Sequence, residues 1–452
     1  MKIIVPMAIC LAATSIQAAS DDSVRLMTLD PGHFHAGLVQ KFMYPQVSPV
    51  VHVYSPGGPE LQDHLKRIEG FNTRAEDPTR WEQKVYSGKD FFKRMIKDKP
   101  GNVVVISGNN QRKTEYIHQS VKSKLHVLAD KPMAINAKDF RLLRKAFAVA
   151  DKNDALLYDI MTERFEITSI LQRDLARFPE LFGVLDKGSV KDPAVEKESV
   201  HHYSKMVSGK PLVRPPWFFD VEQQGEAVPD VGTHLVDLVQ WGCFPGQVID
   251  WKKDIKVLEA NRWPTGLSRE QFKKATGLDE WPAYLRKDVD NAGTLQVFQN
   301  GDVTYAIRGV HAKVAVMWRF EAPPGTGDTH FSKMRGTRAT IFIRQGAEQG
   351  FKPKLYVEAT SGGSRNLEQA LRKAIDKLAQ TYPGLDMKPA SNGWEVVIPE
   401  QYSPGHEAHF TAVTSRYLEF LKDGRMPEWE VPNMIAKYYT TTEAHRLGHK
   451  KK

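Results

Sequence analysis

The chain has 452 residues, of which 41% are hydrophobic and 26% charged, so it is long enough for two ordinary domains and has a globular composition. The net charge is +9, but bases and acids are interspersed and no basic helix carries interleaved aromatics, so we expect no nucleic-acid partner. After the N-terminal segment no apolar run approaches the roughly 18–20 residues that span a bilayer, so we expect no stable membrane insertion.

The first residues, "MKIIVPMAICLAATSIQAAS", give one lysine, an apolar run and then small residues. This pattern predicts a signal peptide over residues 1–18, cut near Ala18 or Ala19, and therefore a periplasmic or secreted protein. The alternative is a buried first strand. Cleavage would leave Cys243 as the single cysteine, so the fold would rely on its core and not on an internal disulfide.

Residues 24–160 alternate between strand-like and helix-like segments. The expected strands are "VRLMTL", "VSPVVHVYS", "NVVVISG", "KLHVLADKP" and "ALLYDIM", and the intervening helices include "HAGLVQKFMY" and "AKDFRLLRKAFAVADKN". Such alternation predicts a parallel, doubly wound α/β sheet of the Rossmann type. Ligands of these sheets bind at the C-terminal ends of the strands.

From residue 161 to 452 the pattern changes to that of an α+β domain. A long helix at "EITSILQRDLARF" precedes period-two stretches such as "EKESVHHYSK", "DVTYAIRGV", "VAVMWRFEA" and "ATIFIRQ". These stretches predict an open, mostly antiparallel sheet. Helices are expected at 364–380 and at "HEAHFTAVTSRYLEFLKDG", where Gly424 would end the helix.

Three motifs, in this order and spacing, carry a family resemblance. They are "VVVISGNNQRKTEYIHQSVKSKLHVLADKPMAIN", "GEAVPDVGTHLVDLVQW" and "MRGTRATI". Together they resemble the glucose-fructose oxidoreductase / inositol dehydrogenase (Gfo/Idh/MocA) family over about residues 24–345 and again over the last fifty. The resemblance implies an exported subfamily with a dinucleotide-binding Rossmann domain over 24–160 and a substrate-binding, oligomerising domain over 161–452. It also implies hydride transfer between NAD(P) and a hydroxyl-bearing carbon of a sugar, in a homo-oligomer.

The resemblance assigns the catalytic work to Lys131, Asp230 and His234. Lys131 stands in Asp130-Lys131-Pro132, where the family has Glu-Lys-Pro, and follows a strand, so it would sit at the sheet edge beside the cofactor. Asp230 and His234 are four apart and share one helix face, which suits proton transfer and alkoxide stabilisation. The alternatives are a surface lysine, a capping aspartate and a core histidine; Asp237 is expected to be structural.

The first turn, "TLDPGHFHAGLV", keeps only Gly32 of the G-x-G-x-x-G fingerprint, the glycine that lets the backbone approach the pyrophosphate. Ser55 stands at the end of the second strand, where an acid would hold the ribose hydroxyls. Glu60 is an alternative acid that could reach back to the ribose. No Arg or Lys immediately follows Ser55 to bind a 2′-phosphate, which favours NAD while leaving NADP possible, and the cofactor is expected to be tightly bound. The expected cofactor contacts are Gly32, His33, Phe34, His35, Ser55, Ser107, Gly108, Asn109, Asn110, Asp130 and Lys131.

A metal site formed by His33, His35 and Asp30 is the alternative use of this turn. A His-x-His pair in a strand-to-helix turn is expected to point its rings apart, and no other ligand cluster has obvious spacing. We therefore expect no metal.

The expected substrate contacts are Arg164 in "TERF", His201 and Tyr203 on one face of a strand, and Trp217 in "RPPWFF". A plain salt bridge for Arg164 and core packing for Trp217 are the alternatives. Three functions stay open: a sugar oxidoreductase, an NAD-dependent glycosidase that uses transient oxidation and elimination, and a non-catalytic carbohydrate-binding protein. The glycosidase would need an extra base, for which Tyr203 and His201 are the candidates.

Overall fold

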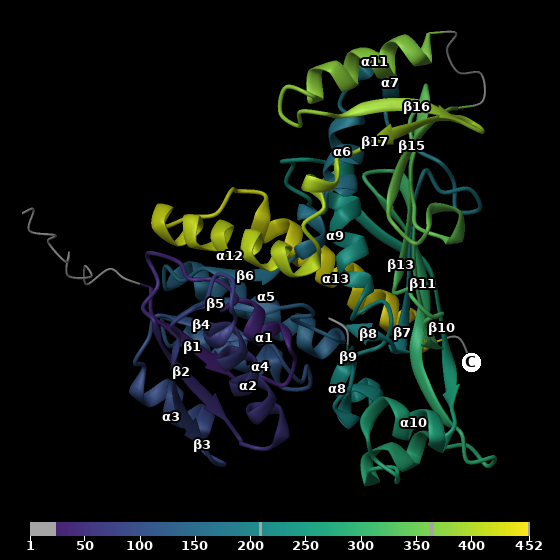
Figure 1. Ribbon diagram of the computed structural model, residues 1–452. Helices are drawn as coiled ribbons and strands as arrows, with labels where there is room; N and C mark the ends of the chain where they lie inside the picture. Colours follow the sequence, from purple (N-terminus) through teal and green to yellow (C-terminus); the bar gives the residue numbers. More distant parts are fainter. Residues whose placement is uncertain (1–23, 208–209, 361–365, 451–452) are drawn as a thin grey trace, which may run out of the picture.

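The computed structural model describes residues 24–207, 210–360 and 366–450. They form two units, each built on its own sheet, that lie side by side (Figure 1). We call residues 24–160 the N-terminal unit and the remainder the C-terminal unit. The predicted signal peptide at 1–18 lies outside the described residues.

The N-terminal unit is a six-stranded, fully parallel sheet in the order β3-β2-β1-β4-β5-β6. Short apolar runs such as "LMTL" and "VVVI" are buried along their whole length, as expected for strands covered on both faces. This confirms the predicted Rossmann sheet. Its strands are β1 (Leu26–Leu29), β2 (Val50–Ser55), β3 (Glu82–Ser87), β4 (Val103–Ile106), β5 (His126–Asp130) and β6 (Leu157–Ile160).

Two local predictions in this unit were wrong. Edge strand β3 was missed, because its polar residues are largely exposed and lack the apolar signal of the central strands. The first helix is only four residues long instead of continuing through "HAGLVQKFMY", since Gly37 and the position before Pro45 both disfavour helix. The helices of this unit are α1 (His35–Leu38), α2 (Pro59–Thr73), α3 (Phe91–Asp98), α4 (Lys113–Lys122) and α5 (Ala137–Lys152).

The C-terminal unit contains a nine-stranded sheet in the order β10-β11-β12-β7-β13-β14-β15-β17-β16. Neighbouring strands are antiparallel except for the parallel pair β12–β7, which confirms the mostly antiparallel prediction. The strands are β7 (Val195–Ser204), β10 (Ile255–Leu267), β11 (Leu295–Ile307), β12 (Val310–Glu321), β13 (Thr329–Arg335), β14 (Ala339–Arg344), β15 (Lys354–Ala359), β16 (Asp386–Ala390) and β17 (Gly393–Val397). A separate two-stranded antiparallel sheet pairs β8 (Met206–Val207) with β9 (Lys210–Pro211).

Helices of the C-terminal unit pack on the sheet and fill the space between the two units (Figure 1). Those used below are η1 (Thr162–Phe165), α6 (Ile167–Leu175), η2 (Pro216–Phe219), α8 (Val221–Gln224), α9 (Gly232–Cys243), α12 (His406–Asp423) and α13 (Glu430–Gly448). The others are α7 (Pro179–Phe182), α10 (Arg269–Thr276), η3 (Ala283–Asp288), η4 (Ala347–Gln349), α11 (Leu367–Leu378) and η5 (Glu400–Tyr402).

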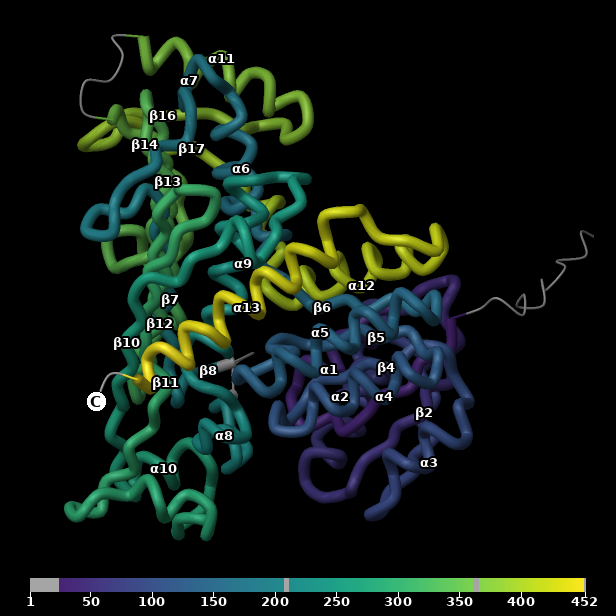
Figure 2. Tube along the Cα trace, turned by 180° about the vertical axis from the view of Figure 1, so that it is seen from behind, coloured from purple at the N-terminus to yellow at the C-terminus, as the bar shows by residue number. Residues whose placement is uncertain are grey.

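The last two helices tie the units together. Phe410 and Tyr417 of α12 and Tyr438 of α13 are buried in the N-terminal core, while α13 also contacts α9 and β10 (Figure 2). After residue 400 the chain therefore returns to the N-terminal unit. The domain boundary at residues 160 and 161 stays a prediction.

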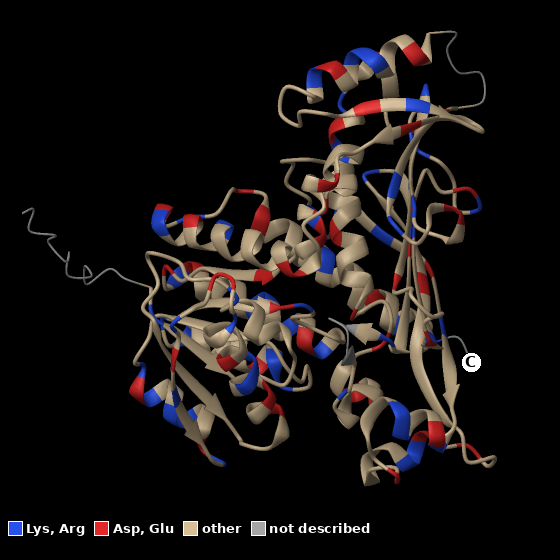
Figure 3. Cartoon of the chain, in the orientation of Figure 1, with Lys and Arg blue, Asp and Glu red and all other residues tan. Residues whose placement is uncertain are grey.

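The surface matches the sequence in its charge pattern. Figure 3 shows basic and acidic side chains interspersed over both units. None of the described helices is both long and apolar enough to cross a membrane.

Candidate functional site

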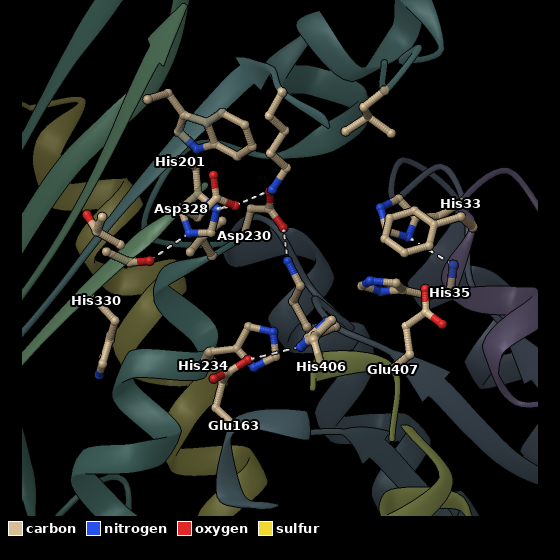
Figure 4. A pocket seen from close by; sticks show the side chains of 18 of the residues that line it. His33, His35, Glu163, His201, Asp230, His234, Asp328, His330, His406 and Glu407 are labelled. Carbon is tan, nitrogen blue, oxygen red and sulfur yellow. Dashed lines mark hydrogen bonds and ion pairs between the residues drawn. The ribbon is translucent and has the colours of Figure 1, made fainter. Parts of the chain in front are cut away.

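A cavity of about 710 Å³ lies between the two units. Its walls come from the first turn, the end of β5, the start of α9, strands β7, β12 and β13, and the start of α12 (Figure 4). The cavity therefore opens at the C-terminal edge of the parallel sheet, as expected for a doubly wound fold.

Lys131 and Asp230 meet in this cavity from opposite units. Lys131 directly follows β5 and is joined to Pro132 by a cis peptide, and its Nζ lies 2.6 Å from Oδ1 of Asp230. The other carboxylate oxygen of Asp230 accepts from Nε2 of Gln224 at 2.8 Å. The side chains of Lys131 and Asp230 are only 12% and 3% exposed, so the pair is held in a largely water-excluded place where its electrostatic effect is strong.

His234 lies one helical turn beyond Asp230 and also lines the cavity. Asp230 itself precedes α9, which begins at Gly232. Burial, with the nearby Lys131 ammonium, lowers the pKa of His234 well below its usual range. The sequence predicts proton transfer for the Asp230–His234 pair, but this imidazole is uncharged at neutral pH, so it can donate or accept a hydrogen bond without changing charge.

Asp130 is the anchor of the first turn. Its Oδ2 accepts from Nδ1 of His35 at 3.0 Å and from Oγ of Ser107 at 2.9 Å, and Nδ1 of His33 lies 3.8 Å from the same oxygen. Burial alone would raise the pKa of Asp130, but the neighbouring His35 and Lys113 outweigh it and hold that pKa well below its usual range. The carboxylate is therefore charged and fixed.

The prediction that the rings of His33 and His35 point apart was wrong. The rings form an edge-to-face pair with centroids 4.1 Å apart, and with Asp130 they bring three ligand-type atoms within 4.8 Å of one another. However, Nζ of Lys113 donates to the Asp130 carbonyl at 3.1 Å, and Lys131 is the next residue. Two ammonium groups beside the cluster oppose a divalent ion by charge, so the arrangement fits a hydrogen-bonded carboxylate better than a cation site.

The sheet wall of the cavity carries a second histidine–carboxylate pair. Nδ1 of His201 lies 3.0 Å from Oδ2 of Asp328, and its Nε2 lies 2.7 Å from Oγ of Ser199. Tyr203 lies on the same side of β7 as His201, since both rings stack on Trp318. Tyr203 is nevertheless fully buried beneath the wall and outside the cavity lining, so only His201 reaches a substrate placed there.

Arg164 does not line the cavity, which corrects the expectation that it contacts substrate. Its guanidinium makes a bidentate pair with Asp237, at 2.6 and 2.7 Å, and a second pair with Glu430 at 3.0 and 3.1 Å. All three side chains are at most 7% exposed. Arg164 instead joins η1, α9 and α13 in the core, and Asp237 is structural as expected.

Trp217 also lies outside the cavity lining. Its Nε1 donates to Oε1 of Glu60 at 3.2 Å, and a Cβ placed on Gly32 would lie 3.3 Å from Cζ2 of the indole. The indole therefore packs on the first turn of the N-terminal unit and is not placed to stack on a sugar in the cavity.

Sequence reasoning missed Glu163 and His406, which line the cavity beside His234 (Figure 4). Burial, with the nearby Glu166, raises the pKa of Glu163 to about 7. Burial, with the nearby His35, lowers the pKa of His406 to about 3. His406 begins α12, about 240 residues after Glu163, and no local pattern links them; Glu163 could have been found only as the neighbour of Arg164.

The residues expected to hold a nicotinamide dinucleotide divide into two groups. His33, Phe34, His35 and Lys131 line the cavity, so the nicotinamide half has space beside the Lys131–Asp230 pair. At the first turn a Cβ on Gly32 would lie 3.3 Å from Cζ2 of Trp217 and 3.4 Å from Cα of Gly108, so the backbone is closely packed there. The remaining expected contacts lie at the strand ends outside the cavity lining: Gly32, Ser55, Ser107, Gly108, Asn109, Asn110 and Asp130.

Comparisons with known proteins agree with this architecture. Residues 171–449 match the family described as "Putative oxidoreductase C terminal domain". The chain belongs to this oxidoreductase family. A crystal structure of "a putative oxidoreductase" from Parabacteroides merdae is 53% identical over 95% of this chain and 98% of its own, with a TM-score of 0.93.

More distant structures share only the fold with this oxidoreductase. Levoglucosan dehydrogenase, solved with NADH and levoglucosan, is 12% identical over 95% of this chain and 98% of its own, with a TM-score of 0.59. KijD10, a 3-ketoreductase from Actinomadura kijaniata solved with NADP, is 12% identical over 94% and 98%, with a TM-score of 0.54. These neighbours share the overall fold that the resemblance implied. No curated relative matches the chain.

Proposed function

We propose that the oxidoreductase transfers a hydride between a nicotinamide cofactor, NAD in preference to NADP, and a hydroxyl-bearing carbon of a sugar or glycoside. The observation that carries this proposal is the 2.6 Å Lys131–Asp230 pair, which faces the cavity beside His234. Sugar-related and nicotinamide-bound neighbours of the same fold support the substrate and cofactor classes.

The proton chemistry follows from these three side chains. In the direction of reduction, Nζ of Lys131 donates a proton to the carbonyl oxygen of the keto-sugar, and in oxidation it takes the proton back. Asp230 fixes the position of the amine through its ion pair, while neutral His234 hydrogen-bonds a neighbouring hydroxyl or the reacting oxygen. When bound, a nicotinamide cofactor supplies or accepts the hydride.

A second function is favoured by the sheet wall. The His201–Asp328 pair stands in the same cavity as Lys131, and a histidine oriented by a carboxylate is a suitable general base. With that base, a glycoside oxidised at one carbon could lose its aglycone by elimination before reduction, which is the NAD-dependent glycosidase alternative. A non-catalytic carbohydrate-binding protein is the third possibility.

We also propose that the protein is exported, periplasmic or secreted, on the basis of the sequence at residues 1–18. Free nicotinamide cofactor is scarce outside the cytoplasm, so a tightly bound cofactor recycled within each catalytic cycle suits that location. A homo-oligomer is proposed on the family resemblance.

The deciding experiment is to denature the purified protein and identify released NAD(H) or NADP(H) by mass spectrometry. Release of a nucleotide, or its binding on titration, supports both enzyme proposals. If the protein neither releases nor binds a nucleotide, the non-catalytic carbohydrate-binding protein is the function that remains. Incubation with an aryl glycoside then separates the enzymes: a keto-glycoside marks an oxidoreductase, and free aglycone without net redox change marks a glycosidase.

Replacing Lys131 tests the proton-transfer role. We expect Lys131→Ala to lower turnover by about 10²–10⁴-fold, as loss of a general acid does, while dinucleotide binding persists. The exposed Lys252 provides a control, and Lys252→Ala should leave turnover unchanged. Normal turnover of Lys131→Ala would refute the assignment.

A further inference from the structure

The lysines that line the cavity are each paired with a carboxylate. The pairs are Lys41 with Glu407 at 2.5 Å, Lys131 with Asp230 at 2.6 Å, and Lys205 with Asp328. The cavity is also lined by Arg214, which shortly precedes η2 and is only 8% exposed. Among the residues that the structure describes, none places a carboxylate oxygen within 4.0 Å of the Arg214 guanidinium.

Arg214 is held in place by contacts that leave one of its nitrogens over. Its Nε donates to the Tyr203 carbonyl at 2.9 Å and its Nη2 to the His202 carbonyl at 2.8 Å, both at the end of β7. The guanidinium carbon lies 4.4 Å from the ring centroid of Phe218 and 5.1 Å from that of Trp318, so cation–π attraction adds to these bonds. Within the described part of the chain, Nη1 has no hydrogen-bond partner and remains available at the cavity wall.

The charge of Arg214 is not neutralised by the protein around it. Burial lowers the pKa of Arg214 to about 10, and the more distant Asp328 offsets only part of that effect. The guanidinium is therefore still charged at neutral pH. Glu163, a further acid of the lining, lies 3.6 Å from Nδ1 of His406 and forms no ion pair with Arg214.

A buried cation of this kind favours an anionic ligand. Burying a charge without an ionic partner is costly, and a guanidinium recovers that cost best through charge-assisted hydrogen bonds to an anion. Because Arg214 is already fixed by β7 and by two aromatic rings, little side-chain entropy would be lost when the anion binds.

The position of Arg214 suits a group of the sugar remote from the reacting carbon. Arg214 lies over the ring of Trp318 in β12, and the same ring stacks on His201 with centroids 5.0 Å apart. This is the sheet wall of the cavity, whereas Lys131 enters from the N-terminal unit (Figure 4). A sugar with its reacting hydroxyl at Lys131 would therefore turn another carbon towards Arg214.

We propose that Arg214 binds a carboxylate of the substrate, so that the oxidoreductase acts on a sugar acid, such as a uronate or its glycoside. The inference rests on the proposed function and names its substrate class. Nη1 donates to a carboxylate oxygen while Nε and Nη2 keep the side chain on β7. A carboxylate brings one negative charge, which matches one uncompensated guanidinium, whereas a phosphate brings roughly two.

The first test compares matched substrates on the unaltered, cofactor-loaded protein. Aryl uronides of the gluco, galacto and manno series are compared with their methyl esters, which keep the shape but lose the charge, and with the matching aryl glycoside phosphates. We expect kcat/KM for the preferred acid to exceed that for its ester by about 10- to 100-fold, as for a hydrogen bond to a charged group. An ester or a phosphate that is used as well as the acid, or better, would overturn the inference.

The second test changes the arginine. Arg214→Gln should raise KM for the acid by about tenfold or more and leave KM for the ester unchanged, because only the charged substrate loses a partner. Arg214→Lys, which keeps the charge, should lie between, and Arg319→Gln, at an exposed arginine of β12, is the matched control. Equal losses for acid and ester would mean that Arg214 only supports β7, and would overturn the inference. The comparison on the unaltered protein stays decisive should the Arg214 variants fail to fold.

Calorimetric titration of the free uronates separates this inference from the proposed function. Uronates that bind the native protein but not Arg214→Gln, without any redox or elimination product, would leave the carboxylate site standing and refute the enzyme. Neutral glycosides that are turned over while no uronate binds would refute the carboxylate site alone. Neither binding nor turnover of any of these compounds would refute both.

Discussion

Arg164→Met should destabilise the protein strongly although Arg164 touches no part of the cavity. Arg164 neutralises Asp237 and Glu430, and Lys437 bridges Asp237 and Asp159 at 2.8 Å each. The substitution would leave three buried carboxylates with a single cation. Removing one partner of a buried ion pair costs about 3–5 kcal/mol, which is a large share of the roughly 5–15 kcal/mol stability of a protein.

The pH dependence of this loss of stability follows from the pKa values of the buried carboxylates. Burial would raise the pKa of Asp237, but Arg164 and Lys437 outweigh it and hold the pKa well below the ordinary 3.8. In the native protein this pairing therefore contributes stability above about pH 3.8, and the contribution is lost as the pH falls through the lower folded-state pKa. Without Arg164, burial dominates and the carboxylates take up protons more readily, so the deficit of Arg164→Met should be largest near pH 8 and shrink towards pH 5.

The assay is urea unfolding at both pH values, compared with Arg269→Met. Arg269 pairs with Glu280 on the surface, where the side chains are 56% and 72% exposed, so this control should cost no more than about 1 kcal/mol. Equal midpoints for the two variants, or a deficit that grows on acidification, would refute the reasoning.

Two further stability predictions follow from single contacts. Gly108→Ala would place a Cβ 2.3 Å from the backbone oxygen of Asp30 and should cost about 1–3 kcal/mol by overpacking. The exposed helical Gly70 has no atom within 4 Å of its Cβ position, so Gly70→Ala should instead stabilise by about 0.5–1 kcal/mol; similar shifts for both in urea unfolding would contradict this. The pKa of Glu163, raised to about 7 from the ordinary 4.5, favours folding below about pH 4.5, and this advantage is lost as the pH rises through 7. Glu163→Gln should therefore gain stability over the native protein between pH 5 and 8, by about 1 kcal/mol after discounting for a side chain that is 35% exposed; a difference independent of pH would exclude the raised pKa.

The sequence by itself determined the parallel sheet, the mostly antiparallel second sheet and the placement of Lys131. Central strands such as "VVVI" are buried on both faces, so each needs a continuous run of apolar residues, and such a run can be recognised in the local sequence. Lys131 follows such a strand, which places it at the ligand-binding edge. Asp230 and His234, four positions apart where the chain enters α9, both line the cavity, because residues this close in sequence reach the same place together.

Only the tertiary structure decided which distant side chains share a space. Lys131 meets Asp230 across 99 positions, His201 meets Asp328 across 127, and Arg164 meets Glu430 across 266. A buried arginine and a ligand-binding arginine have the same local sequence, since the difference lies in which carboxylates the fold brings beside them. The first turn likewise kept Gly32, but the fold alone placed Trp217 beside it.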